Sequence, residues 1–320
     1  MALAIEGARV LVTGGSGMIG SHVVERLLAA GAGEVVVLDQ VIQERNLAAA
    51  LASGRVRTVT ADVRDREALR RVVPGSDAIV HLAAMLMWPA RHDPKPAFEI
   101  NVVASHDLLE LAVELGVARF VFASSISVYG APPDDRPIDE QAPLSARTFY
   151  GAGKAAIELF CRALKDMYGL NYIALRLATV YGPRLHPYGF FPRFLLSILD
   201  QVDRGEVPVV EGDPREVNDV IYVGDVADAV ARAVAADASD VAVNVVSGSA
   251  ITLDEFYGTL LDVYGAPRAI HWQARPFSYV TRRRFSGALA EQLLGFRAST
   301  SLADGLRAFV AWRQGVAGGT

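Results

Sequence analysis

The amino-acid sequence predicts an α/β protein in which a doubly wound parallel sheet is joined by a smaller, interleaved C-terminal part. Apolar stretches alternate with helical patterns along the first half of the chain, which is typical of parallel strands connected by helical crossovers. The first apolar stretch runs directly into a glycine cluster at residues 14–20, and a helical pattern follows it. After about residue 180, proline and glycine interrupt the pattern, so the C-terminal part is expected to be less regular.

The individual elements follow from the spacing of the apolar residues. Strands are predicted at residues 8–12, 34–38, 56–60, 77–80, 119–123, 171–175, 220–223 and 241–246. Helices are predicted at residues 18–30, 65–72, 94–115, 148–168, 226–236, 252–264 and 302–313.

Composition narrows the class of protein. The chain has 320 residues, of which 52% are hydrophobic and 21% are charged, and its net charge is −5. It has no basic block, so we expect no binding to nucleic acid or to a membrane surface. The single cysteine, Cys161, excludes an internal disulfide and a cysteine-based metal cluster, and we predict no metal site. No apolar run approaches the roughly 20 residues of a membrane helix, so we expect a cytoplasmic protein.

The segment 10–20 has the strand–turn–helix context of a dinucleotide-binding loop. Gly14 would allow the tight turn after the strand, Gly17 would let backbone N–H groups approach a pyrophosphate, and Gly20 would let the helix pack closely on the sheet. The helix N-terminus also attracts phosphate. The alternative is a strand–helix turn that binds nothing. The loop residues expected to bind the cofactor are Gly14, Gly17, Met18, Ile19 and Gly20.

The next strand ends indicate which dinucleotide is bound. Asp39 ends the second predicted strand, 19 residues after Gly20. A carboxylate there can bind the adenosine ribose hydroxyls and repels a 2′-phosphate, which favours NAD over NADP. Asp62 and Val63 follow the third strand and could contact the adenine edge, although a capping aspartate is the alternative. The cofactor is also expected close to the small residues after the fourth strand, Leu82, Ala83 and Ala84.

These observations divide the chain into two interleaved domains. Residues 1–178 and 217–246 are interpreted as a Rossmann-type NAD-binding domain. Residues 179–216 and 247–314 are interpreted as a substrate-binding domain that covers the carboxyl ends of the strands, where open α/β sheets bind ligands.

Hydroxyl groups gather where the fifth predicted strand ends, at Ser125 and Ser127. Tyr150 and Lys154 follow and lie on one face of a predicted helix, because they are four residues apart. The pKa of a free tyrosine is about 10, but a nearby ammonium and a positively charged nicotinamide would favour the phenolate. Tyr150 could then exchange a proton with a substrate hydroxyl, while Ser125 holds the same oxygen. For the Tyr–Lys pair alone, an ordinary surface pair is the alternative.

Further motifs complete a pattern that covers nearly the whole chain. They are Gly14-x-x-Gly17-x-x-Gly20, Asp39, Asp62, His81-Leu-Ala-Ala, Asn101, Ser125, Tyr129-Gly130, Tyr150-x-x-x-Lys154, Leu175-Arg176, Val180-Tyr-Gly-Pro-Arg184, Asp219-Val-Ile-Tyr-Val223 and Leu293-Leu-Gly-Phe296. This pattern resembles the extended short-chain dehydrogenase/reductase family, in its NAD-dependent epimerase/dehydratase branch. The resemblance implies that Ser125, Tyr150 and Lys154 are catalytic. It also implies that Lys154 contacts the nicotinamide ribose and that Asn101 lies near the cofactor.

Two absences narrow the reaction that the resemblance implies. The dehydratases of this branch have Thr at the Ser125 position and then an Asp–Glu pair, whereas Ile126 and Ser127 follow here. The fucose-synthase-like members have Cys where Ser127 stands. We therefore expect a sugar-nucleotide 4-epimerase, similar to UDP-glucose 4-epimerase. Such an enzyme oxidises and re-reduces one ring carbon through a keto intermediate, with Tyr150 as acid and base. The intact trio argues against a scaffold that only senses a dinucleotide.

The substrate side departs from the pattern of nucleotide-sugar enzymes. Thr179 stands where Asn is usual, and Asn218 stands where relatives usually have an Arg that holds the diphosphate. Arg215 could replace that Arg. The alternative is an NAD-dependent dehydrogenase or reductase of a secondary alcohol or carbonyl compound without a nucleotide. The expected substrate-binding residues are Met85, Ser125, Ser127, Tyr150, Thr179, Arg184, Asn218 and Arg275.

The two long helices predicted at 94–115 and 148–168 carry apolar residues at helical spacing. Burial against the sheet would explain these residues. Pairing of the same helices across a two-fold axis would also explain them, and we expect a homodimer through these helices.

Overall fold

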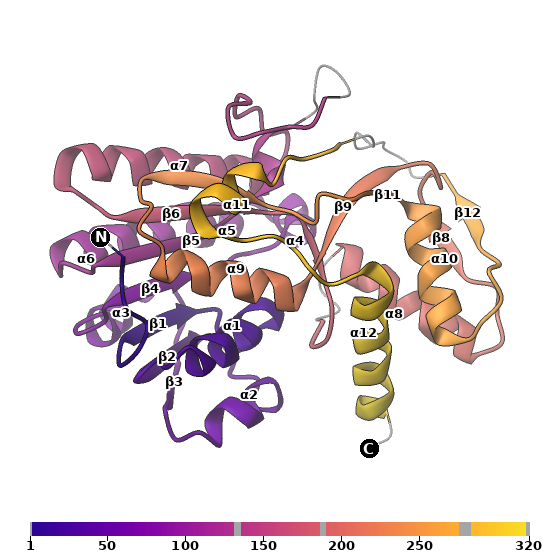
Figure 1. Ribbon diagram of the computed structural model, residues 1–320, viewed down its shortest axis with the longest axis horizontal. Coiled ribbons are helices and arrows are strands. Elements are labelled where there is room, and N and C mark those ends of the chain that lie inside the picture. The colour runs from indigo at the N-terminus through magenta and orange to yellow at the C-terminus, as the bar shows by residue number, and fades with distance from the viewer. Residues whose placement is uncertain (1, 131–135, 186–189, 275–282, 318–320) are drawn as a thin grey trace.

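The structure is a computed structural model, and it describes residues 2–130, 136–185, 190–274 and 283–317. Seven parallel strands form its central sheet, in the order β10-β6-β5-β4-β1-β2-β3. This arrangement confirms the predicted Rossmann-type doubly wound sheet (Figure 1). The strands are β1 (Arg9–Thr13), β2 (Glu34–Asp39), β3 (Val56–Thr60), β4 (Ala78–His81), β5 (Arg119–Ser125), β6 (Tyr172–Leu177) and β10 (Val241–Val245).

Helices cover both faces of this sheet, because alternate side chains of each strand point to opposite sides. One face buries β-strand residues such as Val12 and Val121 against α1 (Met18–Ala29) and α9 (Val223–Ala235). The other face buries residues such as Phe120. The helices on that second face are α3 (Arg66–Val72), α6 (Ser105–Glu114) and α7 (Phe149–Tyr168).

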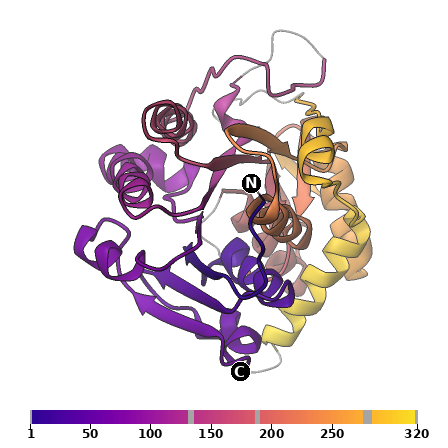
Figure 2. The same ribbon diagram turned by 60° about the vertical axis from the view of Figure 1, so that its left-hand side comes forward.

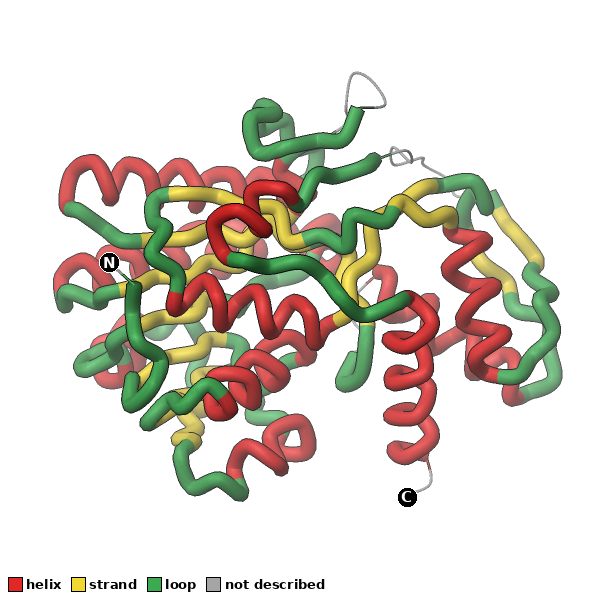
Figure 3. The backbone as a smooth tube through the Cα atoms, in the orientation of Figure 1, coloured by secondary structure: helices red, strands yellow, loops and turns green. Residues whose placement is uncertain are grey.

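A separate apolar cluster forms around the C-terminal helices, at the right of Figure 1. Its helices are α8 (Phe190–Asp203), α10 (Leu253–Tyr264) and α12 (Leu302–Ala317). Two small sheets accompany them, with the strands β7 (Thr179–Tyr181), β8 (Val209–Glu211), β9 (Val217–Tyr222), β11 (Ala250–Thr252) and β12 (His271–Gln273). The tube in Figure 3 shows how much of this part is loop or turn.

The helix predicted at 94–115 is not a single α-helix. Residues Pro94–Phe98 form the short helix α5, Glu99–Ala104 form a π-helical segment, and α6 follows. The chain is helical throughout 94–114, so the predicted helix is confirmed, but periodicity did not reveal the π-helical bulge because such a bulge changes only one turn. Such bulges occur often at functional sites.

Several elements were not predicted, and all of them except the 14-residue helix α8 are short. They are the helices α2 (Glu44–Leu51), α4 (Met87–His92) and α11 (Ala288–Leu294), together with α8 and the strands β7, β8, β11 and β12. Strand β9 also begins three residues earlier than predicted, and α9 begins at Val223. Elements of three to eight residues contain too few apolar positions for a period to show. Among the described residues, no helix is long and apolar enough to span a membrane.

Candidate active site

The glycine loop joins the end of β1 to the start of α1. A Cβ atom on Gly20 would lie 2.2 Å from the carbonyl oxygen of Gly14, so the helix can approach the loop only because residue 20 has no side chain. Gly14 has a φ of 67°, and a Cβ there would lie 2.9 Å from the backbone nitrogen of Ala83. The N-cap residue Gly17 makes no side-chain cap. The first N–H groups of α1 are therefore available to an anion, which fits a dinucleotide pyrophosphate.

The Asp39 carboxylate is held beside this loop. Its Oδ2 accepts hydrogen bonds from the Ser16 hydroxyl at 2.8 Å and from the Ser16 backbone N–H at 3.2 Å. Asn46 Nδ2 in turn donates to the Ser16 carbonyl at 2.9 Å. Oδ2 carries both of these hydrogen bonds, so Oδ1 can accept from a ligand, as ribose hydroxyls require.

Asp62 lies at the carboxyl end of β3 as predicted, but a neighbour binds its carboxylate. Arg64 donates to it from Nη2 at 2.8 Å and from Nε at 3.0 Å. This side-chain hydrogen bond lowers the pKa of Asp62 below its usual value. Val63 is buried in the core beside α3. The adenine contacts of both residues stay a prediction.

A buried histidine fixes the end of β4. The two ring nitrogens of His81 are hydrogen-bonded to the Thr13 hydroxyl at 2.7 Å and to the Ser105 hydroxyl at 2.8 Å. Burial lowers the pKa of His81 to about 3, so the ring is neutral. Thr13 also accepts from the backbone N–H of Ala83 at 3.3 Å, and this contact sets the path of residues 82–84 past the glycine loop.

Asn101 lies in the π-helical segment and is buried. Its Oδ1 accepts from the Met85 backbone N–H at 2.7 Å, and its Nδ2 donates to the Met85 carbonyl at 2.9 Å. Asn101 therefore fixes the backbone of the segment that follows β4. Direct contacts of Asn101 with a cofactor and of Met85 with a substrate stay predictions.

The three predicted catalytic residues come together at the carboxyl edge of the sheet. Ser125 ends β5, and its hydroxyl lies near enough to the Tyr150 hydroxyl to lower the pKa of Tyr150. Lys154 lies one turn later on α7, with Nζ at 5.7 Å from the Tyr150 ring centroid and 4.7 Å from that of Phe122. Ser125 also donates to the Ser127 hydroxyl at 3.1 Å. This arrangement can hold a substrate oxygen and exchange its proton.

The protonation states differ from the simple expectation for a tyrosine beside an ammonium group. Burial raises the pKa of Tyr150 to about 12, and the hydrogen bond with Ser125 lowers it only in part. Burial lowers the pKa of Lys154 to about 7, so its positive charge is partly lost near neutrality. Burial is therefore the largest influence on the pKa of Tyr150. The additional positive charge of a nicotinamide is needed to favour the phenolate.

The predicted substrate side is less compact. Thr179 begins β7 and Asn218 lies in β9, and both are half-buried. The two strands pair in parallel, with Thr179 opposite Val220. Arg275 lies outside the described residues.

The other two arginines considered for the substrate side are already paired. Arg184 Nη2 donates to Glu25 on α1 at 2.5 Å. Arg215 Nη2 lies 2.7 Å from the Asp213 carboxylate, and the Arg215 side chain is 81% exposed. Since Arg215 points into solvent and is neutralised by its neighbour, it does not replace a buried diphosphate-binding arginine in this structure.

Residues 10–246 match the model of the NAD dependent epimerase/dehydratase family. The chain belongs to this family. It is therefore an NAD-dependent enzyme of the epimerase/dehydratase type, and the resemblance seen in the sequence is confirmed.

Individual members of the family are similar over almost their full length. The UDP-glucose 4-epimerase of Mycolicibacterium smegmatis is 33% identical over 93% of this chain and 96% of its own. The structure of the dTDP-glucose 4,6-dehydratase of Streptomyces venezuelae with NAD and TYD bound has a TM-score of 0.88, at 35% identity, over 97% of this chain and 98% of its own. That of the UDP-glucose 4-epimerase of Thermotoga maritima with UDP-glucose also has a TM-score of 0.88, at 28% identity, over 97% and 99%.

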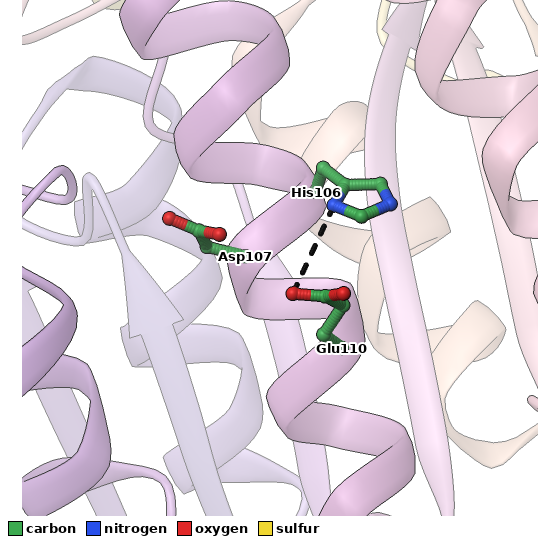
Figure 4. Close-up of side chains that lie close together, drawn as sticks. All are labelled: His106, Asp107 and Glu110. Carbon is green, nitrogen blue, oxygen red and sulfur yellow. Dashed lines mark ion pairs between the residues drawn. The ribbon is translucent and has the colours of Figure 1, made fainter.

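One further cluster of side chains in this family member resembles a metal site. His106, Asp107 and Glu110 lie close together on α6 (Figure 4). Arg66 already pairs with Asp107 at 2.8 Å and with Glu110 at 3.1 Å. The His106 ring packs edge-on against Phe160, with the centroids 4.8 Å apart. These contacts explain the cluster without an ion.

Sequence reasoning missed three groups that position this site. Ser16, which binds Asp39, follows no pattern that would reveal it. A buried ion pair between Glu158 and Arg176 lies behind the catalytic residues. The sequence did contain an indication of Glu158, because it lies eight residues after Tyr150 and thus on the same helix face.

Proposed function

We propose that this enzyme is a sugar-nucleotide 4-epimerase, with a UDP-glucose- or UDP-galactose-like substrate. The observation that carries the proposal is that Ser125 lies near Tyr150 while the residue directly after Ser125 is the apolar Ile126. Ile126 is buried and stands where the related dehydratases have the first residue of their acidic pair. Elimination of water needs an acid and a base at that place, whereas oxidation and reduction at a single carbon does not. The similarity to two UDP-glucose 4-epimerases supports the proposal.

Three residues of the chain have different roles in the proposed reaction. Tyr150 takes the proton from a ring hydroxyl and returns it to the same oxygen after the ketosugar has turned over, so that the hydride goes back to the opposite face of the ring carbon. Ser125 binds the same oxygen and holds it in line. Lys154 lies beside the Tyr150 ring and adds its charge when protonated. NAD, when bound, accepts the hydride from the ring carbon and gives it back.

The binding sites are part of the proposal. We assign the cofactor to the glycine loop and to the strand ends around Asp39, Asp62 and Val63, with Asn101 and Lys154 near the nicotinamide end. The loop geometry and the Asp39 orientation support this assignment. We assign the sugar nucleotide to the side of Ser127, Thr179 and Asn218. The remaining residues of the proposed sites are Leu82, Ala83, Ala84, Met85, Arg184 and Arg275.

A direct assay tests the reaction. Purified protein is incubated with UDP-galactose, and the sugar nucleotides and NADH are both followed. We expect UDP-glucose to form while NADH does not accumulate. A protein that shows no turnover, and that UDP does not protect against heat, would contradict the proposal.

A second candidate function is a dehydrogenase or reductase whose substrate has no nucleotide. The observation that favours it is the pairing of Arg215 with Asp213, next to an uncharged Asn218. Loss of a charge-assisted contact weakens diphosphate binding. Under this alternative, NADH would accumulate in stoichiometric amounts with a secondary alcohol, and UDP would not compete.

The domain division and the dimer belong to the same proposal. The C-terminal apolar cluster, separate from the two sheet cores, supports a substrate-binding domain at 179–216 and 247–314.

The proposed dimer would form through α6 and α7, which pack side by side (Figure 2). Outward-facing apolar residues of α7 would pair across a two-fold axis. Leu159 is 55% exposed and Met167 is 68% exposed. Sedimentation should show a dimer, and Leu159→Glu should yield monomers.

A further inference from the structure

An ion pair is buried behind the catalytic edge of the sheet. Arg176 on β6 donates from Nη2 to Glu158 Oε2 at 2.6 Å and from Nε to Glu158 Oε1 at 3.1 Å. Both side chains are only 6% exposed. Removing two charges from water is costly, and a well-packed apolar pair is often at least as stable. The position of this ion pair therefore needs an explanation other than stability.

Hydrogen bonds connect the ion pair to the active-site segment. The Ser124 hydroxyl donates to Glu158 Oε1. Arg176 Nη1 donates to the Tyr129 hydroxyl at 2.7 Å, and this hydroxyl donates to Asn244 Oδ1 at 2.6 Å. The ion pair thus connects α7 and β6 to the end of β5 and to the turn that follows it, and Tyr129 extends the connection to β10.

Apolar side chains make much of the remaining contact between α7 and the sheet. Ile157, Cys161 and Leu164 of α7 are buried in the same cluster as Phe120 and Phe122 of β5. Apolar contacts of this kind tolerate small shifts of a helix along a sheet. A bidentate contact between a guanidinium and a carboxylate has a fixed geometry, so it selects one register of the helix on the sheet.

That register determines how the catalytic residues meet. Ser124 and Ser125 are neighbours at the end of β5, where the strand passes into the following turn. Tyr150, Lys154 and Glu158 are spaced four residues apart, so they share one face of α7. The hydrogen bond between Ser124 and Glu158 therefore fixes α7 to β5 at Ser124. Ser124 is the residue next to Ser125, whose hydroxyl meets Tyr150.

We propose that Glu158 and Arg176 are positioning residues that hold α7 in register on β5 and β6, so that the Tyr150 hydroxyl meets Ser125. This role rests on the proposed function, because it concerns the same catalytic pair. Neither residue exchanges a proton with the substrate, and both act through Ser125 and Tyr150.

A double variant separates positioning from stability. Glu158→Leu combined with Arg176→Met replaces both charges by apolar groups of similar length, which proteins often tolerate without loss of stability. We expect the melting temperature to be maintained while turnover falls about tenfold to a hundredfold, as for a misplacement of about 1 Å. Ile157→Val, in the same contact but outside the ion pair, is the matched control and should leave turnover unchanged.

A second readout needs no substrate. Ultraviolet difference absorbance reports the Tyr150 phenolate in the NAD complex, with Tyr150→Phe as the blank. The groups that face Tyr150 are Ser125 and Lys154. Since the hydrogen bond with Ser125 lowers the pKa of Tyr150, the double variant should titrate at higher pH. Ser125→Ala should also shift the Tyr150 titration to higher pH. A protein that combines Ser125→Ala with the double variant should titrate at nearly the same pH as Ser125→Ala alone.

Failure of the positioning role can be distinguished from failure of the proposed function. If wild-type protein turns over no sugar nucleotide, the titration still tests the positioning role. A folded double variant with unchanged turnover and unchanged Tyr150 titration would overturn it. If the double variant does not fold, Ser124→Ala removes only one hydrogen bond of Glu158. It should give a smaller shift of the Tyr150 titration to higher pH, and no shift would again overturn the role.

Discussion

The cofactor side and the substrate side of this active site are constructed differently. On the cofactor side, polar groups at the ends of regular strands are held by hydrogen bonds to residues distant in the sequence, such as Asp39 by Ser16 and His81 by Thr13. On the substrate side, the arginines pair with neighbouring carboxylates, such as Arg215 with Asp213. The first arrangement holds the strand ends around the glycine loop in place. The second leaves recognition of the substrate to short elements and loops, where relatives with different substrates can differ.

The largest effect should follow from loss of the acid–base group on the cofactor side. Tyr150→Phe removes the hydroxyl that meets Ser125 and preserves the ring, so turnover should fall by about 10²–10⁴-fold. NAD binding, measured by calorimetry, should be unchanged. A variant that keeps more than a tenth of the wild-type turnover would remove Tyr150 from the mechanism.

The next largest effect should come from the glycine loop. In Gly20→Ala, the new Cβ would meet the Gly14 carbonyl oxygen at 2.2 Å and must displace the start of α1. Overpacking of this kind costs about 1–3 kcal/mol, so NAD affinity should fall about tenfold to a hundredfold. Gly315→Ala in α12 is the matched control, because its Cβ would meet nothing within 4 Å. Equal NAD affinity in both variants would contradict the proposed cofactor site.

A pH-dependent effect should follow from Lys154. Its pKa is about 7 in the folded chain and about 10.4 when unfolded. Between these values the unfolded chain binds a proton that the folded chain has released, so stability without NAD rises with pH by up to about 1.4 kcal/mol per unit. Below about pH 7 both states are protonated and this dependence disappears. Urea unfolding should show the rise in wild type and not in Lys154→Met, whereas parallel curves would show that Lys154 is not buried in this way.

The smallest effect is expected on the substrate side. Arg215→Ala should change the affinity for UDP by less than about threefold, because an exposed ion pair contributes little. Arg204→Ala is the control, since Arg204 is also exposed and pairs with Glu206. If Arg215→Ala alone weakens UDP binding tenfold, Arg215 replaces the diphosphate-binding arginine after all.

The sequence predicted the sheet and the catalytic edge because both depend on local patterns. Most strands of the parallel sheet contain a continuous apolar run, and the Tyr150–Lys154 spacing defines a helix face by itself. The π-helical segment at Glu99–Ala104 and the contact of Ser16 with Asp39 could not be predicted, because they depend on long-range packing. The pKa of Lys154 was missed for the same reason, since spacing does not reveal how completely a side chain is buried.

The central claim is that one ring carbon loses its hydride and regains it on the opposite face. UDP-galactose deuterated at C4 tests it most directly, with mass spectrometry of the UDP-glucose formed and of the NAD recovered from the protein. The account predicts that the deuterium stays at C4 of the product and that the recovered cofactor is unlabelled NAD. Product without the label, or labelled NADH released in proportion to turnover, would contradict it.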